Sequence, residues 1–147
     1  MRKLCPDFIS ARGFKSMIKV FIDGASAGNP GNVGIGYLIY KDDNLVKKNG
    51  IYLGIQTNNF AEYMAFIFAL TEVLGMGEKE LEVFSDSKLL CEQINGNFKV
   101  KNKNIYPLFV LAKNIVSKFV KFSITHIERE KNTDADRLAS EAVGFLI

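Results

Sequence analysis

Four acidic positions in this chain occur at the ends or inside of apolar segments, where no charged side chain is needed. They are Asp23, Glu62, Asp86 and one of the neighbouring pair Asp134 and Asp136. Carboxylates that a fold brings together without Lys or Arg between them repel one another, and a bound cation is the natural compensation. Oxygen-only ligands favour Mg²⁺ or Mn²⁺. Zinc is disfavoured because the chain has one histidine and two cysteines. The candidate chemistry is therefore that of a magnesium site.

Each acid also has a purely structural explanation. Asp23 precedes Gly24, and Asp-Gly is a favoured turn pair. Asp86 stands where an apolar strand gives way to a helix and could simply be the N-cap. Glu62 is harder to dismiss, because six mostly apolar residues follow it and an unpaired buried carboxylate is costly. It could still lie at the exposed edge of its helix, near the favourable positive end. Taken singly, none of these acids establishes a site.

The last acid is ambiguous on spacing alone. Asp134 and Asp136 both open the final helix, where the helix dipole favours acidic side chains. On a helical wheel they flank the apolar stripe at similar angles, so the spacing does not choose between them. Three of the acids lie at strand ends or on the helix after a strand, which is where sites in α/β folds tend to collect.

The hydrophobic pattern predicts the elements that position these acids. Ile18, Val20 and Ile22 recur at every second position and predict a first strand, followed by a small-residue loop at 24–34. Further strands are expected at 35–40, 46–53, 81–84 and 122–127, and helices at 57–74, 87–94, 105–119 and 134–143. This order, which we summarise as βββαβαβα, predicts an α/β (α+β) fold with a mixed sheet and helices on its faces.

Length and composition indicate one globular unit. The chain has 147 residues, of which 48% are apolar and 24% charged. We expect an N-terminal arm at 1–16, which shows no clear period, and a single domain at 17–147. No apolar run reaches the roughly 18–20 residues of a membrane-spanning helix, and the N-terminus lacks the apolar run of a signal peptide. Two cysteines fit a reducing compartment, so we expect a cytoplasmic protein with no membrane partner.

The positive charge is concentrated in one segment. The net charge of the chain is only +3, but residues 99–131 carry eight Lys and Arg against two Glu, a local balance of +6. This segment could face a polyanion. The alternative is a solvated helix face flanked by loops.

Four stretches of the sequence resemble type 1 ribonuclease H. They are IDGASAGNPG at 22–31, TNNFAEYMA at 57–65, FSDS at 84–87 and THIEREKNTDADRLA at 125–139. They occur in the family's order and cover the chain from about residue 18 to residue 143. The resemblance implies a ribonuclease H-like fold with a five-stranded mixed sheet. In that sheet the first three strands are antiparallel and the last two are parallel to the first.

The resemblance also implies an activity and a metal site. The enzyme would be an endoribonuclease that cuts the RNA strand of RNA/DNA hybrids and leaves 5′-phosphate and 3′-hydroxyl ends. Two Mg²⁺ ions, with Mn²⁺ as a substitute, would be held by four acids: Asp23, Glu62, Asp86 and Asp136. Asp134 then becomes a helix-start residue. Asp23 would bridge both ions, and Asp136 would serve the ion that activates water. Glu62 and Asp86 would serve the ion at the leaving oxygen.

Substrate contacts are implied by matching positions near the two strands in the family. These positions are Gly28, Asn29, Asn58, Asn59 and Ser87. Asn side chains suit the task because a 2′-hydroxyl both donates and accepts hydrogen bonds. The structural alternative for residues 28–31 is a tight hairpin turn, which is compatible with substrate contact.

The chain departs from the family in two places. Many bacterial members have a mobile His in the loop before the last helix, whereas this loop is short and contains Arg129. We expect Arg129 to help hold or release the phosphate, the alternative being a surface ion pair with Glu128 or Glu130. His126 falls in the last predicted strand, so we expect a packed or hydrogen-bonded structural residue.

The second departure is the absence of the basic protrusion that longer members insert. In its place are residues 93–104, where Lys99, Lys101 and Lys103 form a modest substitute that we expect to contact phosphates.

Other functions remain open at this level. The same fold could be a catalytically inactive nucleic-acid-binding module, although such a module would not need all four acids. It could also be a nuclease for double-stranded RNA or a relic of a reverse transcriptase, with the same metal chemistry and another substrate. We expect a monomer that acts on an RNA/DNA hybrid, with double-stranded RNA as the alternative partner.

Overall fold

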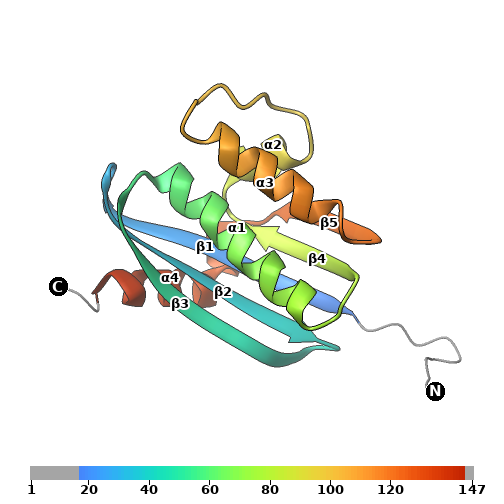
Figure 1. Cartoon of the computed structure of the whole chain (residues 1–147). Helices are drawn as coiled ribbons and strands as arrows, with labels where there is room; N and C mark the ends of the chain where they lie inside the picture. The colour runs from blue at the N-terminus through green and yellow to red at the C-terminus, as the bar shows by residue number, and fades with distance from the viewer. Residues whose placement is uncertain (1–16, 145–147) are drawn as a thin grey trace, which may run out of the picture.

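In the computed structural model, which describes residues 17–144, five strands form one mixed sheet in the order β3-β2-β1-β4-β5 (Figure 1). Strands β1 (Ile18–Gly28), β2 (Gly31–Lys41) and β3 (Asn44–Gln56) are antiparallel. Strand β4 (Glu80–Ser85) pairs in parallel with β1, and β5 (Lys121–His126) in parallel with β4. The mixed sheet and its strand directions confirm the predicted fold.

Helices cover both faces of the sheet, also as predicted (Figure 1). On one face, α1 (Asn58–Gly75), α2 (Lys88–Ile94) and α3 (Tyr106–Val116) share one apolar core with the strands. Helix α4 (Thr133–Gly144) lies on the opposite face, after a short 3₁₀ turn at Arg129–Lys131. Since both α2 and α3 lie between β4 and β5, the full order is βββαβααβα. No helix within 17–144 combines the length and apolar character needed to cross a membrane.

The hairpin of β1 and β2 corrects one prediction. Residues 24–34, expected as a loop, continue both strands until Gly28 pairs with Gly31. Only Asn29 and Pro30 form the turn, so the tight hairpin is confirmed. Asp23 lies inside β1, opposite Gly36, and the turn interpretation of Asp-Gly is wrong. The composition misled because small residues lack an apolar alternation but still pair through their backbones.

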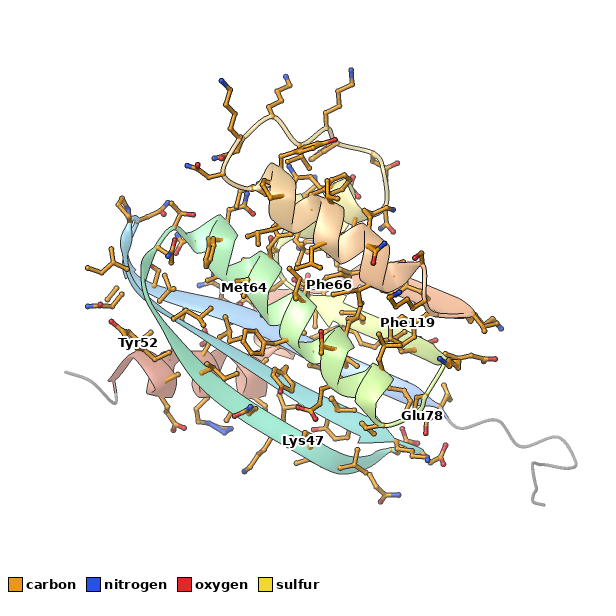
Figure 2. The ribbon with its side chains drawn as sticks, in the orientation of Figure 1. Lys47, Tyr52, Met64, Phe66, Glu78 and Phe119 are labelled. Carbon is orange, nitrogen blue, oxygen red and sulfur yellow. The ribbon has the colours of Figure 1, made fainter. Side chains whose placement is uncertain are left out.

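Glycines on β2 let α4 lie directly against the sheet. A Cβ atom on Gly36 would lie 2.5 Å from the Ala135 carbonyl oxygen, and one on Gly34 would lie 2.5 Å from that of Ala139. Any larger residue would push the helix away. On the other face, Phe66 of α1 lies between helix and sheet and meets Phe122 of β5 edge to face, with ring centroids 5.9 Å apart (Figure 2).

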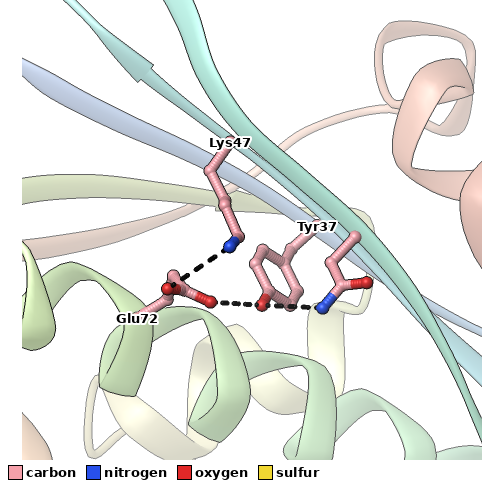
Figure 3. Close-up of polar contacts among 4 residues, drawn as sticks. Tyr37, Lys47 and Glu72 are labelled. Atoms are coloured by element: carbon pink, nitrogen blue, oxygen red, sulfur yellow. Dashed lines mark hydrogen bonds and ion pairs between the residues drawn. The ribbon is translucent and has the colours of Figure 1, made fainter.

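A polar network ties the C-terminal half of α1 to β2 and β3 (Figure 3). The buried Tyr37 hydroxyl donates to Glu72 Oε1 at 2.9 Å and accepts from Asn49 Nδ2 at 3.3 Å. Lys47 Nζ lies 3.8 Å from Glu72 Oε2. Every charged or polar group of this network thus has a partner, which is the usual condition of polar groups inside a fold.

The predicted arm at 1–16, which includes Cys5, lies outside the described residues. Cys91 is buried and has a free thiol.

Candidate active site

Three of the predicted acids meet at one end of the central strands. Asp23 comes from β1, Glu62 from the first turns of α1, and Asp86 directly follows β4. Each offers one carboxylate oxygen, and these oxygens all lie within 4.8 Å of one another. Strands β1 and β4 pair in parallel up to Ile22 and Ser85, so the next residue on each, Asp23 and Asp86, lies beside the other.

Gly24, which follows Asp23 on β1, allows α1 to lie close to the strand. Its N–H donates to Asp23 Oδ1 at 2.9 Å and to Glu62 Oε1 at 2.8 Å, so one amide orients both acids. A Cβ atom at this position would lie 2.8 Å from the Cβ of Ala61 and 3.0 Å from the backbone nitrogen of Glu62. Only glycine allows the helix to come this near. The sequence indicated Gly24 as a turn residue, which hid its role in the site.

Asp136 joins the three acids from the opposite face of the sheet. Its side chain lies close enough to the Asp23 carboxyl group to raise the pKa of that group, although Asp136 is outside the set of three acids whose oxygens lie within 4.8 Å of one another. Asp134, in contrast, is exposed and pairs with Arg137 Nη2 at 2.6 Å. The structure therefore separates two residues that the helical wheel left equivalent, and Asp136 is the one that lies beside the other acids.

Asn132 fixes the position of α4 relative to β1, a role that sequence reasoning missed. This buried residue donates from Nδ2 to the Ile22 carbonyl oxygen at 2.8 Å. Its own backbone carbonyl oxygen accepts from the Asp136 N–H at 3.1 Å. One residue thus connects the strand that carries Asp23 with the helix that carries Asp136. Its only signal in the sequence is a polar residue before a helix start, which many helices share.

Burial and the nearby carboxylates raise the pKa values of Asp23 and Glu62. Burial, followed by the charges of Glu62 and Asp86, raises the pKa of Asp23 to about 9. Burial and the charge of Asp86 raise the pKa of Glu62 to about 8, although the Gly24 N–H and the charge of Arg129 oppose this shift. Within residues 17–144, no Lys or Arg forms an ion pair with any of the four acids.

The donor set fits a hard divalent cation. Asp86 Oδ2 is buried and has no hydrogen-bond partner among residues 17–144, which is an unfavourable state for a carboxylate oxygen. Ser87, not Asp86, caps α2 by accepting from the Leu90 N–H at 3.2 Å, so the N-cap interpretation of Asp86 is wrong. The oxygens of Asp86, Asp23 and Glu62 are the ligand type that Mg²⁺ and Mn²⁺ prefer.

Arg129 and His126 are both residues that could assist the acids. Arg129 is exposed in the 3₁₀ turn, and its charge lowers the pKa of Glu62, which places the guanidinium within electrostatic reach of the acids. Within the described part of the chain, it forms no ion pair with Glu128 or Glu130. His126 ends β5, is exposed and forms no side-chain hydrogen bond within residues 17–144, so the expectation of a packed or hydrogen-bonded histidine is wrong.

The predicted substrate contacts fall into two groups. The exposed Asn29 accepts through Oδ1 from the Asn58 N–H at 3.0 Å, which joins the hairpin turn next to Gly28 with the start of α1, where Asn59 and then Glu62 follow. Ser87 follows Asp86 directly. The second group, Lys99, Lys101 and Lys103, is exposed on the loop between α2 and α3. Figure 2 shows nitrogen-tipped side chains that project from this loop away from the domain.

The chain is similar to a family model and to curated proteins. A family model described as "Reverse transcriptase-like" matches residues 21–142. A bifunctional protein of Mycobacterium tuberculosis is 37% identical over 123 residues, which make up 82% of this chain and 34% of the relative. A ribonuclease HI of Halobacterium salinarum is 36% identical over 127 residues, 86% of this chain and 64% of the relative. The chain thus spans about one third and about two thirds of these two curated relatives.

The fold is also shared with a solved nucleic-acid complex. The structure of LC11-RNase H1 in complex with an RNA/DNA hybrid has a TM-score of 0.83 and 37% sequence identity to this chain. The match covers 88% of this chain and 98% of the other.

Proposed function

The chain belongs to the type 1 ribonuclease H family, and on that premise we propose that it is an endoribonuclease acting on RNA/DNA hybrids. It cuts the RNA strand and leaves 5′-phosphate and 3′-hydroxyl ends. The observation that carries this proposal is the cluster of Asp23, Glu62 and Asp86, whose carboxylate oxygens converge within 4.8 Å without a neutralising ion pair among the residues described.

The four acids hold the metal in this proposal. Asp23, Glu62, Asp86 and Asp136 would bind two Mg²⁺ ions, with Mn²⁺ as a substitute. Bound ions of this kind lower the pKa of an attacking water and stabilise the charge that develops on the departing 3′ oxygen. Metal binding would also displace the protons that the raised pKa values favour on Asp23 and Glu62, because a carboxyl group must be deprotonated to act as a ligand.

The remaining side chains place the substrate. Asn29 and Asn58 contact each other at the start of the helix that carries Glu62, and they offer amide groups to the 2′-hydroxyls that distinguish RNA from DNA. Gly28, Asn59 and Ser87 add backbone and hydroxyl contacts in the same proposal. Arg129 holds the phosphate at the open side of the cluster, since its charge already acts on Glu62.

The loop between α2 and α3 binds the substrate at a distance from the cut. Lys99, Lys101 and Lys103 are exposed, and none forms an ion pair within residues 17–144. Unpaired cations on one loop suit the phosphates of a nucleic acid. Because all four acids come from one chain, a monomer suffices for the activity.

The proposal is tested by cleavage of end-labelled strands in three duplexes: an RNA/DNA hybrid, double-stranded RNA and double-stranded DNA as the control. Each is incubated with Mg²⁺, with Mn²⁺ and with a chelator. We expect cleavage of the hybrid's RNA strand only with a divalent ion, and its loss in Asp23→Asn. Binding without cleavage would instead identify an inactive binding module. Preferential cleavage of double-stranded RNA would show that the substrate is double-stranded RNA and not the hybrid.

A further inference from the structure

A buried amide connects the helix that carries Glu62 with the loop that carries the lysines. Tyr63 follows Glu62 in α1, and its hydroxyl donates to Gln93 Oε1 on α2 at 2.7 Å. Both side chains are buried, with 0% and 5% of their surfaces exposed. A buried amide is normally held by its hydrogen bonds, so this contact defines where Gln93 lies relative to α1.

The other end of the same amide reaches the lysine loop. Gln93 Nε2 donates to the carbonyl oxygen of Lys99 at 3.4 Å. Helix α2 ends just before this segment, at Ile94, and Gly96 has a φ of +84°, which favours glycine. Val100 then packs against the apolar core. The exposed side chain of Lys99 is thus anchored through its own backbone to a residue that also holds α1.

Glutamine is suited to this double contact because its amide has both an acceptor and a donor. A methionine of similar length would satisfy neither the Tyr63 hydroxyl nor the Lys99 carbonyl. The contact partners lie 30 and 6 residues away in the sequence, so no local pattern explains the choice of residue.

We propose that Gln93 is a positioning residue, which sets the Lys99–Lys103 loop at a fixed place relative to the turn of α1 that bears Glu62. Phosphates bound by the lysines are thereby kept in register with the phosphate at the acids. This inference rests on the proposed function, because it assigns the loop to the same hybrid substrate. A merely structural Gln93 would only fill the core and satisfy Tyr63.

The test compares Gln93→Met and Tyr63→Phe in the wild-type chain and in a chain with Lys99, Lys101 and Lys103 replaced by Ala. The Kd for a fluorescent RNA/DNA hybrid is measured by anisotropy in a chelator, and KM and kcat are measured with Mg²⁺. We expect Kd and KM to rise at least threefold in the wild-type background, with kcat within twofold. No further rise is expected in the triple-Ala background, because the lysines that Gln93 positions are gone.

Tyr37→Phe is the matched control, because it removes another buried hydroxyl bonded to the same helix, far along α1 at Glu72. It should leave Kd and KM unchanged. Should Gln93→Met fail to fold, Tyr63→Phe alone decides, since it removes a single oxygen atom.

Unchanged Kd and KM in the folded variants, or an equal rise in both backgrounds, would overturn the inference and leave the proposed function intact. A wild-type chain that binds the hybrid but does not cut it would overturn the proposed activity, while the anisotropy still tests Gln93. A chain that neither binds nor cuts the hybrid overturns both.

Discussion

Two glutamates on one helix show how differently this fold treats the same side chain. Glu72, in the C-terminal half of α1, receives a hydrogen bond from Tyr37 and lies 3.8 Å from Lys47 (Figure 3). Glu62, near the start of the same helix, receives one from the Gly24 N–H but faces the carboxylates of Asp23 and Asp86. Both side chains are partly buried.

The difference separates a carboxylate that stabilises the fold from one that serves a ligand. Around Glu72 the chain supplies the compensating donor and cation itself. Around Glu62 it adds further carboxylates, and the described part of the chain supplies no hydrogen-bond partner for Asp86 Oδ2. Local repulsion that persists in a well-packed fold is typical of a functional site, where stability is sacrificed for activity. The divalent cation of the proposed function would compensate the negative charge at this site.

The largest effect on kcat should come from exchanging Glu62, but not Glu72, for glutamine. Glu62→Gln removes a metal ligand, and we expect kcat for hybrid cleavage to fall about 10³-fold, since metal stabilisation of the transition state amounts to several kcal/mol. Glu72→Gln is the matched control and should retain kcat within about twofold. Initial rates at saturating hybrid and Mg²⁺ measure both. Equal reductions of kcat in the two variants would show that Glu62 is no more important for catalysis than Glu72.

The opposite ranking is expected for stability. Glu72→Met leaves the buried Tyr37 hydroxyl without its acceptor, and we expect the free energy of unfolding to fall by about 1–3 kcal/mol. Glu62→Gln relieves repulsion and should not destabilise the metal-free protein. Urea unfolding in a chelator compares the two variants with the wild type. A Glu62→Gln protein that is less stable than Glu72→Met would show that Glu62 has a structural role.

The pH dependence of stability sharpens the same comparison. The pKa of Glu62 is raised to about 8 in the folded protein, whereas a glutamate in an unfolded chain has a pKa of about 4.3. Between these values the folded state holds more protons than the unfolded state, so this contribution to stability is present at low pH and is lost as the pH rises towards 8. We expect urea unfolding of the metal-free wild type to show this decline. The decline should be smaller in Glu62→Gln, and Mg²⁺ should restore stability most at the alkaline end. A pH profile identical in the two proteins would contradict the crowding argument.

The smallest effect concerns the three lysines of the α2–α3 loop, which form no ion pair with any residue that the structure describes. Replacing Lys99, Lys101 and Lys103 with Ala should reduce the slope of log affinity against log salt by roughly 0.7–0.9 for each phosphate that the variant no longer neutralises. Lys47, which is paired with Glu72, is the control, and Lys47→Ala should leave the slope unchanged. Hybrid binding measured in a chelator at several salt concentrations gives both slopes. An unchanged slope in the triple variant would remove the loop from the substrate interface.

The sequence predicted the elements with a strong periodic pattern and missed those defined by contacts. Strand β1 was visible from the alternation of Ile18, Val20 and Ile22, and α1 from its length and its glycine-marked end. The extension of β1 through Ala25–Gly28 was not visible, because its small residues are held by pairing with β2 rather than by an apolar face.

The site residues, too, were predictable where a sequence motif marks them and not where only contacts in the folded chain do. Family motifs indicated Asp23, Glu62 and Asp86, and the structure brings them together. The choice between Asp134 and Asp136 needed the resemblance at first and the packing of α4 afterwards, because both residues occupy similar angles on a helical wheel. Asn132 and Gln93 could not be predicted, since their partners are distant in the sequence and only the folded chain brings them within hydrogen-bond distance.

The most direct test of the account is calorimetric titration of the substrate-free protein with Mg²⁺. We predict that the wild type and Glu72→Gln bind Mg²⁺ with the same affinity, and that Glu62→Gln and Asp23→Asn bind it at least about tenfold more weakly, because each loses a charged oxygen ligand. Unchanged Mg²⁺ binding in both Glu62→Gln and Asp23→Asn would show that the acidic cluster does not hold the metal, and the account would fail.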